Sequence, residues 1–233
     1  MKAVLSCLSC DPSRGDCIAM LICNPRRQLS FARVGGQQWH WITTSPLYAQ
    51  YSDSIYHNNA FYAMTRQGGI HRYTIEGSCA SCSCDVVFKD TLPYIAYNVY
   101  IARTLSGDVS QIWRFTDNPC EGKEMHMNGI EIYKLVFDHQ CIISVDSLGN
   151  DALFIGHSYT CCLSTRDYPK LLPGHVYFTD DAEYWPVECK NIRRDVGIYN
   201  LEDDTSLDVV SSQPWLNWPN PIWITPSFTK INQ

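Results

Sequence analysis

The feature that most constrains this chain is the rhythm of its short apolar or alternating runs, each ended by Gly, Pro, Asn or Asp. Runs of this length are typical of β-strands, and the residues between them favour hairpin turns. Pairs of such runs return about every 40–50 residues. Four-stranded blades of about that length make a propeller, so the rhythm predicts an all-β, β-propeller-like fold with about four blades of antiparallel strands. A large β-sandwich would give a similar pattern.

The whole chain is predicted to form a single domain, with no linker that would divide it. The predicted blades lie near 1–46, 47–92, 93–146 and 147–210. Strands are predicted at 17–23, 29–34, 39–43, 54–57, 60–65, 70–75, 97–105, 109–115, 130–138, 141–145, 151–155, 176–180 and 196–201. Segments rich in Ser and Cys, or in Pro, Gly and charge, are predicted to be exposed loops at 77–90 and 118–128, and 164–172 is predicted to be a turn or one helical turn.

Charge and composition argue against several partners and compartments. The formal net charge is −6, and the basic residues are scattered, so nucleic-acid binding has little support. No apolar stretch approaches the roughly 20 residues of a membrane span, and the apolar run at the N-terminus is too short for a signal peptide. Twelve cysteines in 233 residues fall below the density of a disulfide scaffold, so we expect a cytoplasmic or nuclear protein with reduced thiols.

Two cysteine clusters have spacing that zinc sites also use. They are Cys7 with Cys10, and Cys79 with Cys82 and Cys84. Tetrahedral zinc needs four converging ligands, and the two clusters lie about 70 residues apart, so free thiols are the favoured interpretation. The histidines form no metal signature, and no Cys–His pair stands out as catalytic. We therefore expect no catalytic residues, no metal, no cofactor and no enzyme.

Acidic and aromatic clusters near the C-terminus are interpreted as structural. The acidic residues at 180–183 and 202–204 fit turn chemistry and solvation better than calcium binding or acid–base catalysis. The Cys161–Cys162 pair alternates across a strand and is interpreted as packing. Packing is also favoured over a recognition surface for three tryptophans that lie among prolines, namely Trp215, Trp218 and Trp223.

Several ordered motifs resemble one known family. They are 29–33 (LSFAR) followed by Trp39, 53–56 (DSIY), 61–63 (FYA), 69–71 (GIH), 147–156 (SLGNDALFIG), 177–181 (YFTDD), 195–202 (DVGIYNLE) and 221–227 (PIWITPS). Together they resemble the plant F-box-associated family of domain of unknown function 295, the KIB-type β-propeller, from about Lys2 to Phe228. The motif residues assigned a structural role are Phe154, Gly156, Tyr177, Phe178, Asp180, Asp181, Asp195, Gly197, Trp223 and Pro226.

The resemblance implies a propeller that recruits a substrate protein for a ubiquitin ligase. Members of the family typically carry an N-terminal F-box, which docks the Skp adaptor of a cullin-RING ligase. Nothing before Asp11 could form that helical module, so direct Skp-adaptor binding is not expected of this chain. The chain is expected to begin partway through the propeller and to form an incomplete ring, in which 223–226 lacks its usual neighbour and leaves an aggregation-prone open side.

Protein binding is therefore the leading functional hypothesis, with an unknown substrate protein as the partner. A non-functional truncated paralogue or structural remnant is the alternative. A zinc-binding protein or an enzyme is a third, weaker hypothesis.

Overall fold

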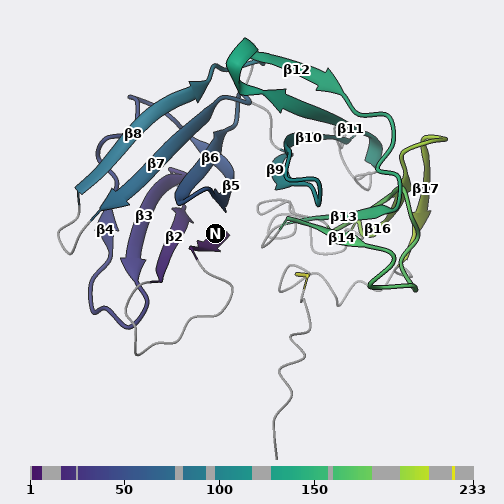
Figure 1. The fold of residues 1–233 in the computed structure, drawn as a ribbon, viewed down its shortest axis with the longest axis horizontal. Helices are drawn as coiled ribbons and strands as arrows, with labels where there is room; N and C mark the ends of the chain where they lie inside the picture. The colour runs from purple at the N-terminus through teal and green to yellow at the C-terminus, as the bar shows by residue number, and fades with distance from the viewer. Residues whose placement is uncertain are drawn as a thin grey trace, which may run out of the picture.

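Four β-sheets, arranged as blades around a common centre, make up the described part of the chain (Figure 1). The computed structural model describes residues 2–6, 17–24, 26–76, 81–92, 98–116, 127–156, 160–179, 195–209 and 222–223. Blade 1 holds β1 (Lys2–Leu5), β2 (Ile18–Cys23), β3 (Gln28–Arg33) and β4 (His40–Trp41). Blade 2 holds β5 (Tyr51–His57), β6 (Ala60–Thr65), β7 (Ile70–Glu76) and β8 (Ser81–Phe88).

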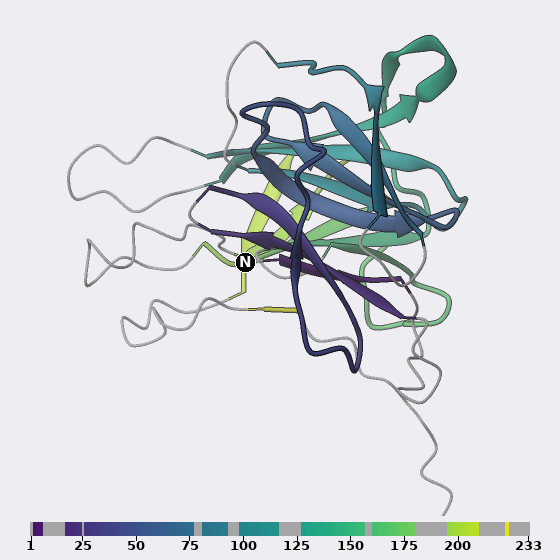
Figure 2. The ribbon, with the colours of Figure 1, turned by 90° about the vertical axis from the view of Figure 1, so that its left-hand side faces the viewer.

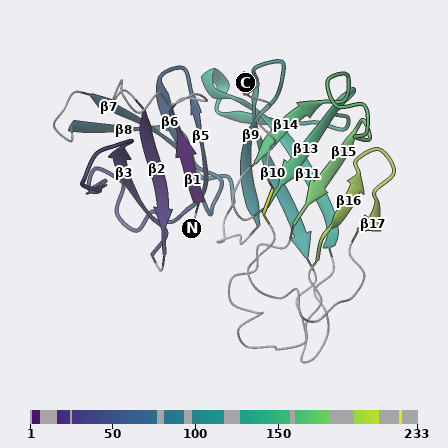
Figure 3. The ribbon, with the colours of Figure 1, turned by 90° about the horizontal axis from the view of Figure 1, so that it is seen from below.

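The other two blades follow in chain order. Blade 3 holds β9 (Val99–Arg103), β10 (Val109–Thr116), β11 (Met127–Val136) and β12 (Cys141–Ser144), with the 3₁₀ turn η1 (Phe137–His139) before β12. Blade 4 holds β13 (Asp151–Ile155), β14 (Cys161–Ser164), β15 (His175–Phe178), β16 (Gly197–Asn200) and β17 (Thr205–Asp208). Figure 3 shows blades 1 and 2 on one side of the molecule and blades 3 and 4 on the other.

The predicted all-β fold with about four blades is confirmed, and each sheet falls within its predicted blade boundaries. One predicted loop is wrong, because most of 77–90 forms β8. Cys82 and Cys84 lie half-buried on one face of β8, while Ser83 and Asp85 are exposed on the other. A strand with small residues on its inner face therefore resembles a polar loop in sequence. Within the described ranges, no helix is long and apolar enough to cross a membrane.

Local sequence explains how the strands are paired. In β2, Ile18, Met20 and Ile22 are buried in alternation, as the twofold repeat of a strand requires. Asn58 and Asn59 join the paired residues His57 and Ala60 of β5 and β6, and both have positive φ, at 47° and 59°. A two-residue hairpin of this kind needs positive φ at both central positions, which Asn tolerates better than most residues.

Blade 4 departs from simple antiparallel order. Its strands lie in the order β14-β13-β15-β16-β17, and β13 runs parallel to β15, with Leu153 opposite Val176. The chain turns back after β13 to form β14, which lies against β9 of blade 3. β14 pairs with one edge of β13, so that edge is no longer free. The next strand, β15, therefore pairs with the opposite edge of β13.

Each pair of consecutive blades encloses one hydrophobic core. Met20 and Phe31 of blade 1 pack with Phe61 and Tyr73 of blade 2. The core between blades 2 and 3 includes Met64, Ile70, Phe88 and Ile101, and that between blades 3 and 4 includes Ile112, Ile132, Leu153 and Phe178. Among the described residues no such core joins blade 4 to blade 1, and the incomplete ring stays a prediction. The aggregation-prone open side stays a prediction.

One buried carboxylate, that of Asp53 on β5, connects several blades. It accepts hydrogen bonds from the Ile101 backbone N–H at 3.2 Å and from Thr160 Oγ1 at 2.8 Å, and the Lys2 ammonium lies 3.3 Å away. A register irregularity between Tyr51 and Asp53 marks a bulge in β5, and bulges re-aim the side chains beside them. One side chain of blade 2 thereby contacts blade 1, blade 3 and the segment that enters β14.

Candidate functional site

The family-motif residues of blade 4 form an aromatic cluster. The rings of Phe154 and Tyr177 stack with their centroids 4.6 Å apart, and Trp223 packs edge-on against Phe154 at 5.0 Å. The Trp223 indole N–H donates to the Ile155 carbonyl at 2.8 Å. Trp223 therefore packs on the last blade with its polar atom satisfied, which is a structural role.

Two motif glycines allow close approach in the same blade. A β-carbon at Gly156 would overlap the Thr179 hydroxyl, and one at Gly197 would lie 2.6 Å from the ring of Phe178 and 2.7 Å from the Leu207 carbonyl. A larger residue at Gly156 would require the Thr179 side chain to move, and one at Gly197 would require the backbone of β17 to shift. The aromatic ring of Phe178 is itself buried.

Asp195 joins blade 4 to blade 3. Its carboxylate lies 2.6 Å from the Arg114 guanidinium of β10, and both side chains are buried. Arg114 also donates to the Thr179 carbonyl at 3.3 Å and lies over the Phe178 ring at 4.9 Å. The positive charge of Arg114 is thus paired within the fold. The remaining motif residues Asp180, Asp181 and Pro226 lie outside the described residues.

The cysteines are placed in surroundings that disfavour thiolates. Burial raises the pKa of Cys161 to about 12 and that of Cys162 to about 11, and it also raises the pKa of Cys82 and of Cys84. Since the thiolate is the nucleophile and the metal ligand, these thiols are poorly suited to either role at neutral pH. Cys7, Cys10 and Cys79 of the zinc hypothesis lie outside the described residues.

Cys17 is disulfide-bonded, so the expectation that all thiols are reduced is wrong at this position. The described ranges contain no group of three or more His, Cys, Asp or Glu residues that could hold a metal ion.

The acidic residues at 202–204 serve the turn between β16 and β17. Asp203 accepts hydrogen bonds from the Thr205 backbone N–H at 3.1 Å and from its hydroxyl at 2.5 Å. Asp204 has a positive φ of 56° and accepts a hydrogen bond from the Tyr199 hydroxyl at 2.6 Å. The turn interpretation of this cluster is confirmed. The cluster at 180–183 lies outside the described residues.

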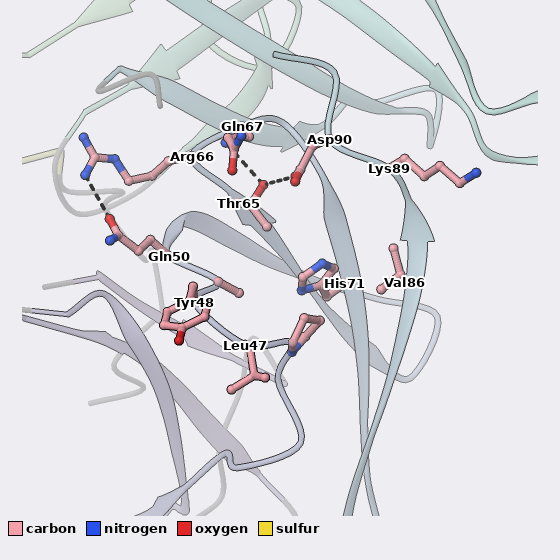
Figure 4. Close-up of a pocket in the computed structure, with 12 residues that line it drawn as sticks. Leu47, Tyr48, Gln50, Thr65, Arg66, Gln67, His71, Val86, Lys89 and Asp90 are labelled. Carbon is pink, nitrogen blue, oxygen red and sulfur yellow. Dashed lines mark hydrogen bonds between the residues drawn. The ribbon is translucent and has the colours of Figure 1, made fainter. Parts of the chain in front are cut away.

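A pocket that none of the sequence motifs indicated lies beside the linker between blades 1 and 2 (Figure 4). Its volume is about 420 Å³, and we call it the rim pocket. The linker supplies one wall, and the β6–β7 turn and the segment around β8 supply the others. The lining residues are Pro46, Leu47, Tyr48, Ala49, Gln50, Thr65, Arg66, Gln67, His71, Val86, Lys89 and Asp90. Figure 2 shows blades 1 and 2 facing the viewer.

The linker wall is a strained turn that holds two large apolar residues outward. The Ala49 N–H donates to the Pro46 carbonyl at 3.2 Å, and Tyr48 has a φ of 64°. These features fit a type II turn, whose third position favours Gly or Asn. Leu47 is 88% exposed and Tyr48 95% exposed, so neither gains stability by packing. A bulky residue in this conformation costs about 1–2 kcal/mol, and such strain is often kept where it serves function.

A chain of neutral hydrogen bonds lies behind the pocket. His71 Nδ1 is 2.6 Å from the Tyr51 hydroxyl, which is 2.5 Å from the Tyr73 hydroxyl, which is 2.8 Å from the Ser45 hydroxyl. Burial raises the pKa of Tyr51 to about 12 and raises that of Tyr73 further. Burial also lowers the pKa of His71, so its imidazole is neutral at pH 7. These hydrogen bonds form a buried structural network. His71 is its one member that lines the pocket, and its Nδ1 is already bonded to Tyr51.

The rim pocket is lined by two cationic residues, Arg66 and Lys89, and by one carboxylate, that of Asp90. Asp90 is occupied, because its Oδ1 accepts from the Thr65 hydroxyl at 2.7 Å and from the Gly69 N–H at 3.1 Å. Arg66 donates to the neutral Gln50 side chain at 3.1 Å. Figure 4 shows Lys89 across the pocket from Arg66, and no ion-pair partner of Lys89 is found among the described residues. The pocket therefore combines an apolar wall with an excess of positive charge.

The fold defines the class of protein, a four-bladed β-propeller, and its surface carries an apolar, basic pocket between blade 2 and the linker that precedes it. The family model described as KIB1-4 beta-propeller matches residues 2–200. The chain belongs to this family. No curated protein and no solved structure matches the chain.

Proposed function

We propose that this chain is a protein-binding propeller of the substrate-recognition type, and that its partner docks at the rim pocket. The observation that carries the proposal is the turn at Pro46–Ala49, which holds Leu47 and Tyr48 almost fully exposed in a strained conformation. Neither side chain stabilises the fold, whereas both are suited to bury against a partner. Exposed apolar residues beside a pocket, with a polar rim, are features of protein interfaces.

The proposal extends to the class of pathway in which the propeller acts. The resemblance to plant F-box-associated receptors suggests that the bound partner is a substrate for ubiquitination. Recognition and adaptor docking are separate tasks in that arrangement, and we assign only recognition to these 233 residues. Direct binding of the Skp adaptor is not expected of them.

Binding is favoured over catalysis by the state of the titratable groups. The buried thiols have raised pKa values, and the His71 nitrogen that could act as a base is engaged by Tyr51. Nucleophilic catalysis needs an activated thiolate or hydroxyl beside a base that is free to take its proton.

Affinity purification tests the proposal. The tagged wild-type chain is compared with a Leu47→Ser/Tyr48→Gly variant and with a Leu207→Ser control in plant extract. Leu207 is 64% exposed on β17 of blade 4, so the control removes a similar apolar group far from the rim pocket in the chain. We expect specific proteins that the wild type and Leu207→Ser retain and that the double variant loses, as measured by quantitative mass spectrometry. A partner set that the double variant retains in full would contradict docking at this site.

A further inference from the structure

Building on the proposed function, we infer that the rim pocket binds an extended segment of a partner protein in which a large apolar side chain lies next to a carboxylate. We infer the chemistry of the partner from three properties of the pocket. They are the apolar residues of its wall, the sign of its charge and the exposure of the side chains that a ligand would have to cover.

The apolar wall provides for one large side chain of the partner. Leu47 and Tyr48 border the pocket from the linker, and Val86, which is 56% exposed on β8, borders it from blade 2. A side chain held between them would bury apolar surface from the linker and from blade 2. Burial of a side chain such as Leu or Phe is among the largest single gains available to a small interface.

The charge of the pocket selects a carboxylate beside that side chain. The lining holds two cationic residues, Lys89 and Arg66, against the one carboxylate of Asp90, and His71 is neutral, so its formal charge is more positive than negative. The chain as a whole has a formal charge of −6, so this local excess is opposite to the average. A partner carboxylate would complement the pocket, whereas the net charge of the whole chain has the same sign as the carboxylate.

The exposure of the pocket wall favours a polypeptide over a small molecule or a second copy. A small ligand inside about 420 Å³ would leave the outer surfaces of Leu47 and Tyr48 in water, because these residues are 88% and 95% exposed. An extended segment covers both the pocket and the turn that forms its wall. A second copy of this chain would bring a second charge of −6 to the interface, which disfavours self-association.

A displayed library of random nonapeptides is the probe for this proposal. It is selected separately on the wild-type chain, on Tyr48→Gly and on Lys89→Glu, with Leu207→Ser and Lys170→Glu as matched controls. Gly suits the positive φ at position 48, so Tyr48→Gly removes the side chain without straining the fold. Lys170 is exposed and near blade 4, so Lys170→Glu changes the net charge as Lys89→Glu does, but away from the pocket.

We expect the wild type and both controls to enrich peptides that carry an aromatic or large aliphatic residue next to Asp or Glu. Affinity for the enriched peptides should fall about tenfold in Tyr48→Gly, as measured by fluorescence polarisation, because one anchor contact is lost. In Lys89→Glu it should fall about fivefold, with the difference shrinking as salt is raised, because an exposed ion pair is worth up to about 1 kcal/mol.

Several outcomes would overturn the inference, and they separate it from the proposed function. Enriched peptides with no acidic residue, or with affinity unchanged in Lys89→Glu, would show that the charge argument is wrong while docking at the pocket stands. Peptides whose affinity is unchanged in Tyr48→Gly would show that binding occurs elsewhere on a protein-binding propeller. Failure of the wild type to enrich any peptide would count against both. A wild-type dimer that Tyr48→Gly dissociates, seen by analytical ultracentrifugation, would assign the pocket to a second copy instead.

Discussion

At the junction of blades 3 and 4, the Arg114 guanidinium lies 2.6 Å from the Asp195 carboxylate, and both side chains are buried. In the core between blades 1 and 2, a buried network of neutral side chains runs from His71 through Tyr51 and Tyr73 to Ser45, whereas the charged contact between these two blades involves other residues, Lys2 and Asp53. The first junction encloses its charge. The second borders the rim pocket and leaves apolar residues exposed at its edge. The first arrangement stabilises the fold, and under the proposed function the second leaves a surface for contact with a partner.

The largest expected effect is at the charged junction. Arg114→Ala leaves the Asp195 carboxylate buried without its partner, and loss of one member of a buried ion pair costs about 3–5 kcal/mol. The free energy of unfolding from urea titration measures this loss. The control is Lys134→Ala, which breaks an ion pair with Asp108 that is about 40% exposed on both sides and should cost less than about 1 kcal/mol. Equal losses in the two variants would contradict the structural role assigned to Arg114.

A smaller effect is expected at the neutral hydrogen-bond network between blades 1 and 2. Tyr73→Phe removes the hydroxyl between Tyr51 and Ser45, and leaving buried partners unsatisfied costs about 1–3 kcal/mol. Urea titration again gives the measurement. Tyr133→Phe is the matched control, because its hydroxyl donates to Glu131 at the exposed surface, so its loss should be close to zero. If Tyr73→Phe were as stable as the wild type, the hydrogen-bond chain would not support this junction.

The third effect is a dependence on pH. Burial lowers the pKa of His71 below its ordinary value of 6.5, so the unfolded chain takes up the proton at a higher pH than the folded chain. Stability should therefore be complete above about pH 6.5 and should decrease as the pH falls from there through the folded-state pKa. His71→Gln should reduce this slope. Some slope should persist, because burial lowers the pKa of His57 in the same direction. A slope that His71→Gln leaves unchanged would exclude His71 as its source.

The smallest expected effect, and the one of opposite sign, is at the exposed turn. Tyr48→Gly relieves the strain of a positive φ and removes a side chain that contacts little, so the folded chain should be as stable as the wild type or up to about 1 kcal/mol more stable. Thermal unfolding provides the measurement. Together with lost peptide binding, this result would show stability given up for function. A clearly destabilised variant would mean that Tyr48 packs within the fold after all.

The sequence predicted the fold better than it predicted the site. The spacing of the predicted strands placed all four blades, because turn residues such as Asn58 and Asn59 favour a hairpin whatever the rest of the chain does. β8 was missed because its inward residues are Cys82 and Cys84, whose size gives little hydrophobic alternation. The parallel pairing of β13 and β15 depends on where β14 lies, which no local pattern encodes.

The rim pocket was not predicted, because its lining comes from three separated segments whose residue types are ordinary. Pro46 was interpreted as the end of blade 1, and nothing in the sequence shows that Tyr48 is left exposed. The one available signal was the pair of large apolar residues, Leu47 and Tyr48, directly after Pro46 in a segment that is not a strand. Asp53 belongs to a family motif, yet its partners Ile101 and Thr160 could be known only from the way the blades lie around one another.

The Asp53 carboxylate has a kinetic consequence. Its hydrogen-bond donors on Ile101 and Thr160 lie 48 and 107 positions further along the chain. Contacts between residues so distant in sequence form only after the intervening blades have brought them together. Interactions absent from the folding transition state act on the unfolding rate and leave the folding rate nearly unchanged. The centre of this propeller is therefore expected to set how long the folded ring lasts, while the hairpins of the individual blades set how fast it forms.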